Sequence, residues 1–577
     1  MKRQYRGLPI LGWLGDYRPE TLKSDLFAGL IVGVMLIPQG MAYALIVGVP
    51  PVYGLYAAIF PQLVYAVLGT SRRLSVAPVA TDSLIVASGV GAIAVSGSDD
   101  FLSMTILLAG MVGVIQILLG LFKMGFITNL LSKPVITGFT AAAAFIIAFS
   151  QMKHLFGMES LSQESLAETI RNVFADPGRL NWLPILFGLT GILIIVTAKK
   201  ISKKIPGPLI AVILSISAVY IFKIYEGQID ILRDIPEGLP GFSLPQFSME
   251  KAGSLLPLAL TLSLISYMES FSIAKLMEFQ KKDHKINPNQ ELIALGSANL
   301  VGSLFRSFPT AGGFSRSAVN NQAGAKTPMA SVISALLIVM TLLFLTPVFY
   351  YLPKAILASI ILVSVVSLVD VVYIKKLFYD SKTEFIILIA TFLVTIGFSM
   401  VVGIAVGVAL SVLFLLYKSA YPHIVQLGRV YGHHEFRNVR RFKELEIWDN
   451  IMIVRLDASL SFINIQYFRD YLDTEITKKG NQVDTIILDG GPISFIDASA
   501  VNGLKDLLDS LKAREIKFLV CDLIGPVRDT IYRSGLIDFI GEENIFFDLN
   551  ETIRYSTTNN PGRYKEYALQ SNIKPEG

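Results

Sequence analysis

The sequence predicts an α-helical polytopic membrane protein that ends in a small soluble α/β domain. Of its 577 residues, 53% are hydrophobic and only 16% are charged, whereas soluble domains carry about 25% charged residues. The mean hydropathy is +0.56. The charge is unevenly distributed, because the first 420 residues hold 31 basic and 22 acidic side chains and the last 157 hold 19 and 23. This composition excludes a soluble, disordered or disulfide-stapled secreted protein.

The hydropathy pattern divides the chain into four regions. We expect residues 1–21 to be a cytosolic segment, because they lack the apolar core of a signal peptide. Residues 22–420 form the expected transmembrane domain, and several of its segments are shorter than the roughly 20 residues that cross the hydrocarbon. The fourteen expected segments are 22–46, 51–69, 78–96, 101–122, 127–152, 181–198, 207–224, 254–274, 289–305, 313–323, 327–349, 352–370, 383–399 and 402–420.

Basic residues predict the orientation. The even-numbered connections between segments hold 16 lysines and arginines, and the opposite connections hold about half as many. The positive-inside rule then places both chain ends in the cytoplasm of a cell-membrane protein. The only cysteine, Cys521, lies in the soluble part, so no disulfide within the chain is possible. We expect no metal and no cofactor.

Two segments carry helix-breaking residues at positions that should lie deep in the bilayer, where the backbone is normally helical. One reads SRRLSVAPVATDSL (71–84) and the other reads RSFPTAGGFSRSAV (306–319). Non-helical backbone at this depth is tolerated only where it is buried in protein or lines a cavity. We expect Leu74–Ala77 to be extended, with Pro78 at the start of a half-helix because its missing N–H is an orphan there. A second half-helix should begin near Gly312-Gly313.

These two interrupted segments predict an internal repeat. Pro78 and Gly312 are 234 residues apart, and IPQGMAYA (37–44) stands opposite YMESFSIA (267–274) at an offset of 230. Seven segments in each half give the second half the inverted topology. Matching broken helices in two repeats indicate the binding site of a transporter.

The half-helices predict the charge of the ligand. The N-terminus of a helix presents free N–H groups and about half a positive charge, so two such ends form an anion site. Arg316 in the second half-helix stays protonated, and an anionic substrate is a natural partner for it. The alternative is a structural salt bridge from Arg316 to Glu269 or Asp82.

Glu269 is a candidate proton-coupling residue. It lies on a segment with Ser263, Ser266 and Ser270 on one polar face, and its carboxylate would repel an anion only when ionised. The alternative is a fixed partner for Arg316 without titration. Gln39 and Tyr43 share a face of the first segment and could line the site, although Tyr43 could equally serve helix packing.

Three long motifs resemble the SulP anion-transporter family: PPVYGLYAAIFPQLVYAVLGTSRRLSVAPVA (50–80), LSKPVITGFTAAAAFIIAFSQMKHLFG (131–157) and FPTAGGFSRSAVN (308–320). The resemblance covers nearly the whole chain. It implies a 7+7 inverted repeat divided into core and gate subdomains, elevator-like alternating access, a homodimer and a C-terminal STAS domain in the cytoplasm.

The resemblance also implies the site residues. Family positions for the anion match Gln39, Tyr43, Pro78, Val79, Glu269, Gly313, Phe314, Ser315 and Arg316. Val79 replaces an aromatic residue of animal members, which would widen the site. Sodium-coupled bicarbonate members of the family tend to lack the arginine, so the resemblance implies that Arg316 disfavours sodium and that Glu269 favours protons, as in plant-like sulfate symporters.

The region 421–557 is expected to hold a linker and the soluble domain. Strands are predicted at 450–458, 484–489 and 517–522, and helices at 464–479, 498–516 and 526–535. ILDGGPISFIDASAVNGL (487–504) resembles the STAS strand–loop–helix, in which Ser499 is either a phosphorylated regulatory residue or simply a helix N-cap. The polar stretch 558–577 is predicted to be a disordered tail.

Proton-coupled sulfate uptake is therefore the leading hypothesis, followed by bicarbonate transport (sodium-coupled or exchange) and dicarboxylate transport. A STAS-based signalling protein or channel, and a nucleobase permease of the same 7+7 fold, remain alternatives from other classes. The sequence shows no phosphate-binding loop and no catalytic cluster, so an enzyme is not expected. The expected partners are a small anion, the lipid bilayer and a second copy of the chain, and no nucleic acid.

Overall fold

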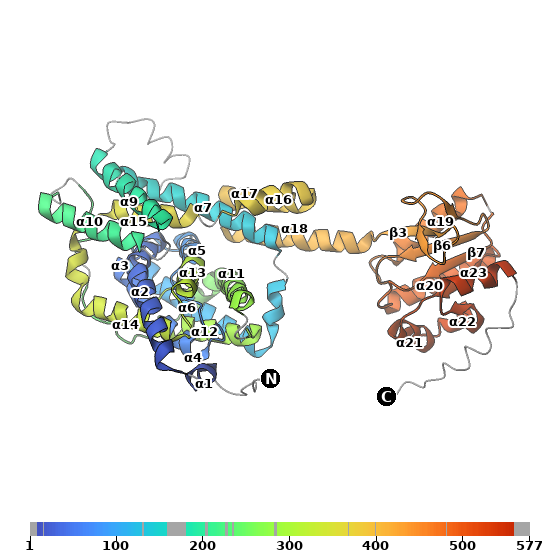
Figure 1. The fold of residues 1–577 in the computed structure, drawn as a ribbon, viewed down its shortest axis with the longest axis horizontal. Helices are drawn as coiled ribbons and strands as arrows, with labels where there is room; N and C mark the ends of the chain where they lie inside the picture. Colours follow the sequence, from blue (N-terminus) through green and yellow to red (C-terminus); the bar gives the residue numbers. More distant parts are fainter. Residues whose placement is uncertain are drawn as a thin grey trace. The chain divides into compact units, whose positions relative to one another are not determined.

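The computed structural model describes residues 9–15, 17–129, 132–157, 181–201, 206–224, 229–233, 236–281, 285–366, 369–398, 400–480 and 482–558. The expected polar tail falls outside these residues, apart from Thr558. The chain divides into two compact units, Met1–Ser411 and Val412–Gly577, which are coloured along the sequence in Figure 1. The division lies inside the last long apolar helix, and the composition changes slightly later, near Tyr421.

The membrane unit is built almost entirely from helices. Those of the first half are α1 (Pro9–Leu14), α2 (Pro19–Val47), α3 (Pro51–Tyr56), α4 (Phe60–Leu68), α5 (Ala80–Gly91), α6 (Asp99–Leu121), the 3₁₀ helix η1 (Met124–Asn129), α7 (Lys133–Phe156), α9 (Trp182–Ile201) and α10 (Gly207–Phe222).

The second half repeats this organisation. Its helices are α11 (Met249–Lys281), α12 (Pro288–Leu304), α13 (Phe314–Gln322), α14 (Met329–Phe344), η3 (Thr346–Tyr351), α15 (Lys354–Val366), α16 (Val371–Asp380), α17 (Lys382–Gly397) and α18 (Met400–Ala420). Each of the fourteen expected segments overlaps a helix of the described residues. Eight spans there are long and apolar enough to cross a membrane.

Two segments differ in detail from the expectation. The second expected segment (51–69) is split into α3 and α4, because Pro61 has no N–H to continue a helix through Ala57–Ile59. The twelfth is followed by α16, which lies in an expected connection. Asp370 starts this helix by accepting a hydrogen bond from the N–H of Tyr373 at 2.9 Å, as an N-cap residue does.

The two interrupted segments meet as a short antiparallel ladder. Strand β1 (Val76–Ala77) pairs with β2 (Ala311–Gly312), with Val76 opposite Gly312. Helix α5 follows β1 and α13 follows β2, so the two half-helices begin beside one another. The prediction that Pro78 starts the first half-helix is wrong. Val79 is the N-cap and α5 begins at Ala80, because the carbonyl of Pro78 accepts a hydrogen bond from Arg316 instead of entering the helix.

Glycines allow the helices behind the site to approach closely. A Cβ atom on Gly296 of α12 would lie 2.7 Å from the carbonyl oxygen of Gly113 on α6, and one on Gly113 would lie 2.7 Å from the carbonyl of Gly296. Gly29 of α2 similarly faces the backbone of Ala330 on α14. In lipid, no hydrophobic effect drives helices together. Small residues let two helices approach closely, and the resulting van der Waals contacts stabilise the pair. One apolar core joins both halves of the repeat.

The soluble unit is a sheet covered on both faces. Its strands run in the order β4-β3-β6-β7-β8-β9, with β5 paired to β3. Strands β6 to β9 are parallel, and β3 is antiparallel to β6. The strands are β3 (Ile424–Val430), β4 (Phe436–Asn438), β5 (Leu445–Glu446), β6 (Ile451–Leu456), β7 (Thr485–Asp489), β8 (Lys517–Cys521) and β9 (Ile545–Phe546).

One face carries the larger apolar core, to which α19, α20, α21 and α22 contribute, and the other face carries a smaller core that includes α23. The helices are α19 (Ile465–Lys478), α20 (Ala498–Ala513), α21 (Gly525–Arg533), α22 (Ile537–Ile540), η4 (Glu542–Asn544) and α23 (Leu549–Thr558). The three strands and three helices expected here all form. Strands β3 to β5, within the expected linker, and helix α23 were not foreseen.

Candidate anion site

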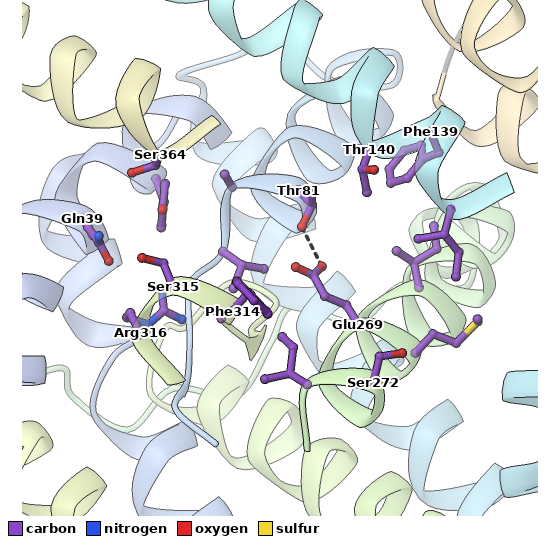
Figure 2. A pocket seen from close by; sticks show the side chains of 18 of the residues that line it. Gln39, Thr81, Phe139, Thr140, Glu269, Ser272, Phe314, Ser315, Arg316 and Ser364 are labelled. Atoms are coloured by element: carbon purple, nitrogen blue, oxygen red, sulfur yellow. Dashed lines mark hydrogen bonds between the residues drawn. The ribbon is translucent and has the colours of Figure 1, made fainter. Parts of the chain in front are cut away.

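A cavity of about 330 Å³ lies at the point where the two half-helices begin. Its walls come from the N-terminal ends of α5 and α13, from α2 and α11 beside them, and from α7, α15 and α18. Figure 2 shows side chains from these elements around a common space. The interrupted segments of the two repeats therefore build one chamber, with segments more than 200 residues apart in the sequence on facing walls.

Neither half-helix is capped by a side chain. Val79 and Gly313 are the N-cap residues, both are extended, and neither provides a side-chain hydrogen bond to the first turn. The first N–H groups of a helix have no partner within the helix and carry a partial positive charge. Both Val79 and Gly313 line the cavity. The two helix ends can therefore offer N–H groups to a negatively charged ligand.

Arg316 adds a full positive charge to these helix ends. Its side chain is buried, and its Nη1 and Nη2 donate to the carbonyl oxygens of Pro78 (2.7 Å) and Ala77 (3.2 Å). The Nε–H has no hydrogen-bond partner. Among the described residues, no carboxylate lies within ion-pair distance of this guanidinium, so the structure does not form the alternative salt bridge to Glu269 or Asp82. Arg316 is oriented across the repeat interface by neutral carbonyls, which leave it without an ion-pair partner among the described residues.

Gly313 makes room for that guanidinium. A Cβ atom at this position would lie 2.6 Å from Nη2 and 2.7 Å from Cζ of Arg316. The backbone there has φ −90° and ψ 124°, which any residue can adopt. The glycine is therefore needed for space and not for its backbone freedom.

Polar contacts from the core helices hold β2 in place. The N–H of Gly312 donates to Ser270 Oγ at 2.7 Å, and Asn299 accepts from the N–H of Thr310 at 2.8 Å and donates to its carbonyl at 3.1 Å. On the other strand, the N–H of Ser75 donates to Ser317 Oγ at 3.0 Å. These bonds satisfy backbone groups that the interrupted helices leave open. Ser270, predicted as part of a polar face, thus supports the site from behind.

Glu269 faces the cavity from α11, opposite the first half-helix. Thr81 of α5 donates a hydrogen bond to its Oε2 at 2.8 Å, drawn as the dashed line in Figure 2. Ser272, on the same helix, also lines the cavity. The carboxyl group is thus in contact with the space that holds Arg316 but is not bonded to it, an arrangement in which it can change protonation without breaking an ion pair.

The remaining predicted site residues are also brought together. Gln39, Tyr43, Phe314 and Ser315 line the cavity, and only Pro78 lies outside it, contributing a carbonyl to Arg316. Gln39 Oε1 is buried without a hydrogen-bond partner. Gln39, Ser315 and Arg316 line the same cavity, and all three are labelled in Figure 2. These groups can therefore supply a polar wall for a ligand at the arginine.

Sequence reasoning missed several lining residues. Thr81 lies three residues after Pro78 in the motif that was already identified, so its place was available from the sequence. Phe139 and Thr140 of α7, Ser364 of α15 and Ile404 of α18 were not foreseen. Their segments carry no breaker or buried charge that singles them out, and only packing brings them to the cavity.

Within the described residues, no group of three His, Cys, Asp or Glu side chains could hold a metal ion.

In the soluble unit, the expectation that Ser499 could cap α20 is wrong. Asp497 is the cap, and its carboxylate accepts from the N–H of Ala500 at 2.8 Å. Ser499 lies two residues after this cap, inside the helix, and is exposed.

Comparison with known proteins identifies the family. A family model described as the sulfate permease family matches residues 22–391. The chain belongs to the sulfate permease family. A STAS domain model matches residues 443–552, which coincides with most of the soluble sheet and its helices.

Relatives of this family match along the whole chain. The chain is 36% identical over 564 residues to "Sulfate transporter 4.1, chloroplastic" of Arabidopsis thaliana, covering 95% of this chain and 82% of the relative. It is 31% identical to "High affinity sulfate transporter 2" of Stylosanthes hamata, covering 94% and 85%. These proteins are named as sulfate transporters, which places this chain among anion transporters.

Solved structures agree with the fold. The murine Solute Carrier 26 family member A9 anion transporter in its inward-facing state superposes with a TM-score of 0.88 at 25% identity, covering 96% of this chain and 94% of that one. The transmembrane domain of the cyanobacterial bicarbonate transporter BicA gives a TM-score of 0.59 at 23% identity, covering 69% and 98%. The fold is thus the 7+7 inverted repeat with core and gate subdomains, followed by a STAS domain.

Proposed function

We propose that this chain carries sulfate across the cell membrane together with protons, by elevator-like alternating access in a homodimer whose termini and STAS domain are cytoplasmic. The observation that carries the proposal is the arginine at the half-helix ends. Arg316 is buried beside two uncapped helix N-termini and bonds only to neutral carbonyls. A buried cation is costly unless it is paired, and an anion entering the cavity would supply the missing partner.

The charges at the site fit a dianion. Arg316 contributes one positive charge, and each half-helix end contributes about half a charge. Sulfate carries two negative charges, which this sum balances when Glu269 is neutral. An ionised Glu269 would leave the site about one charge short. Sulfate is also the substrate for which the plant relatives are named.

This balance suggests how the proton is coupled. Burial disfavours an ionised carboxyl group, and Glu269 shares its cavity with the arginine and both helix ends. Protonation of Glu269 would favour sulfate binding, and release of sulfate would favour loss of the proton. Thr81, which bonds to Glu269, lies in the first turn of α5. A change at Glu269 is therefore transmitted directly to one half-helix.

The cavity walls support an elevator movement. The half-helices and Glu269 belong to the core subdomain, whereas Phe139, Ser364 and Ile404 come from gate helices α7, α15 and α18. The site thus lies along the boundary between the two subdomains. A rigid displacement of the core against the gate would carry the anion site across the membrane while its internal contacts stay intact.

The test is uptake of labelled sulfate into proteoliposomes that hold the purified protein, under an inward proton gradient and without sodium. We expect accumulation above equilibrium that collapses with a protonophore. Sodium-driven bicarbonate uptake without proton-driven sulfate uptake would overturn the proposal and make the protein a bicarbonate transporter.

Two variants assign the roles. Glu269→Gln should abolish accumulation driven by the proton gradient while sulfate exchange persists, and Arg316→Ala should weaken sulfate binding at least tenfold. Glu278→Gln is the matched control on α11, because Glu278 is paired with Lys275 away from the cavity. Wild-type accumulation in Glu269→Gln would remove this residue from the coupling.

A further inference from the structure

Helix α5 carries a carboxyl group that the proposed mechanism does not use. Asp82 is the third residue of α5, its side chain is 0% exposed, and neither Oδ1 nor Oδ2 has a hydrogen-bond partner. It does not line the cavity. A buried carboxylate normally has several hydrogen bonds or a cation, so the missing partners of this group need a physical reason.

Among the described residues, the helices packed around α5 supply no cation to Asp82. Those neighbours are α2, α6, α7 and α11. The group on them whose charge acts on Asp82 is Glu269 of α11, which has the same sign. The titratable side chain of α2 at this level is Tyr43, and the guanidinium of Arg316 is turned to the carbonyls of Ala77 and Pro78. Helices α6 and α7 carry their charged or titratable residues in their first or last turns: Asp99, Asp100, Lys133, Lys153 and His154.

The surroundings therefore favour a neutral Asp82. The partial charge at the start of α5 attracts an ionised carboxylate, but this attraction is much smaller than the cost of burying a charge without water, hydrogen bonds or a cation. A protonated acid removes that cost, and a group that stays neutral only by holding a proton can release it when its environment changes.

Asp82 is also connected to the coupling residue. The preceding residue, Thr81, donates its hydroxyl to Glu269 Oε2 at 2.8 Å. Asp82 and Glu269 thus lie on facing helices joined at one turn of α5. Two carboxyl groups that act on one another do not ionise independently, and their protons belong to the pair.

We propose that Asp82 is a second proton-binding residue of the transport domain, holding a proton in this conformation and titrating as a pair with Glu269. The pairing extends the proposed proton coupling, on which its role in transport rests. Its protonation does not depend on which anion is carried. The chemistry is a proton transfer between carboxyl groups and water, with no other reactant.

Infrared spectroscopy of the full-length protein at neutral pH tests the assignment directly. A protonated carboxylic acid has its own carbonyl-stretch band, separate from those of carboxylates. We expect Asp82→Asn to lose one such band that wild type and Glu278→Gln retain. Asp82→Leu, which keeps the branched shape and the number of heavy side-chain atoms but carries no charge, should give the same difference spectrum and provides a second variant if the asparagine protein does not fold. Retention of every carboxylic acid band in these variants would overturn the proposal.

The coupling has its own readout. Two carboxyl groups that titrate as a pair lose their protons in two steps, whereas a single group loses its proton in one step. The pH profile of sulfate uptake should therefore change from two steps in wild type to one step in Asp82→Asn. An unchanged profile would overturn the pairing. If the infrared band disappears but wild-type uptake does not follow the proton gradient, the proposed function fails while the protonated Asp82 stands. Proton-driven uptake with no band assigned to Asp82 would overturn the protonated Asp82 and leave the proposed function standing.

Discussion

Replacing Gly313 by alanine should move the arginine of the anion site without disturbing the fold. The new Cβ atom would lie 2.6 Å from Nη2 and 2.7 Å from Cζ of Arg316, which is closer than real Cβ atoms come, and 3.0 Å from Nη1, which is tighter than most. The guanidinium is the flexible end of a side chain, so it must shift. The backbone at Gly313, with φ −90°, accepts an alanine without strain.

The shift breaks the bonds that orient Arg316. These are its hydrogen bonds to the carbonyls of Pro78 at 2.7 Å and Ala77 at 3.2 Å. A hydrogen bond to a charged group contributes roughly 1.5–3 kcal/mol. A displaced guanidinium that makes one charge-assisted hydrogen bond fewer to the bound sulfate would weaken sulfate binding about 10- to 100-fold, since about 1.4 kcal/mol corresponds to a factor of ten.

Calorimetric titration of sulfate into the detergent-solubilised protein measures the change, and labelled uptake gives the accompanying KM. Gly253→Ala is the control, because nothing lies within 4 Å of a Cβ atom at that position in α11. Wild-type sulfate affinity in Gly313→Ala would refute the reasoning if Arg316→Ala is impaired, because the position of the guanidinium would then not matter to binding.

Three further outcomes follow from the packing, the cap and the buried thiol. Gly296→Leu should lower the thermal unfolding midpoint of the membrane unit, because the larger side chain separates α6 from α12. The control Gly253→Leu should leave this midpoint nearly unchanged. Equal midpoints in the two variants would contradict the close approach of Gly296 to Gly113. Asp497→Ala should destabilise the STAS domain by about 1 kcal/mol through loss of the cap on α20, seen as a lower urea midpoint, and Asp497→Asn should restore most of it. Burial, together with the nearby charges of Asp522 and Asp489, raises the pKa of the Cys521 thiol well above its ordinary value, so maleimide should label it at neutral pH only after the domain opens; rapid labelling of the native protein would show that the thiol is accessible.

The placement of the helices was largely available from the sequence. Every expected segment overlaps a helix of the described residues, because a backbone in hydrocarbon must satisfy its own polar groups and a helix does so with local bonds. The predicted helix boundaries were wrong where a single residue ended or started a helix. Pro61 split the second segment, and Asp370 started a helix in an expected connection.

The candidate site was partly available for the same reason. Helix-breaking residues such as Pro78 and Gly312-Gly313 are rare deep in a membrane, and Arg316 follows the glycine pair closely. These residues therefore identify the two segments that form the site. Residues such as Ser364 and Thr140 have no such signal, since their neighbours look like ordinary helix and only the packing of α15 and α7 brings them to the cavity. The sequence left the partner of Arg316 open between an anionic substrate and the carboxylate of Glu269 or Asp82. It gave no sign of the two carbonyls of the other repeat, because only the fold brings them to the guanidinium.

The sequence by itself determined the membrane class, the repeat of interrupted helices and the presence of an anion-favouring charge, because composition, breakers and ionisable residues are local properties. The tertiary structure alone decided that Arg316 bonds to carbonyls of the other repeat, that Gly313 leaves space for it, and that Asp82 is buried without a partner. The first of these features joins residues more than 200 positions apart, and that distance is set by how the helices pack and not by any one segment. The same contact fixes where the guanidinium lies beside Gly313, and the packing of neighbouring helices buries Asp82.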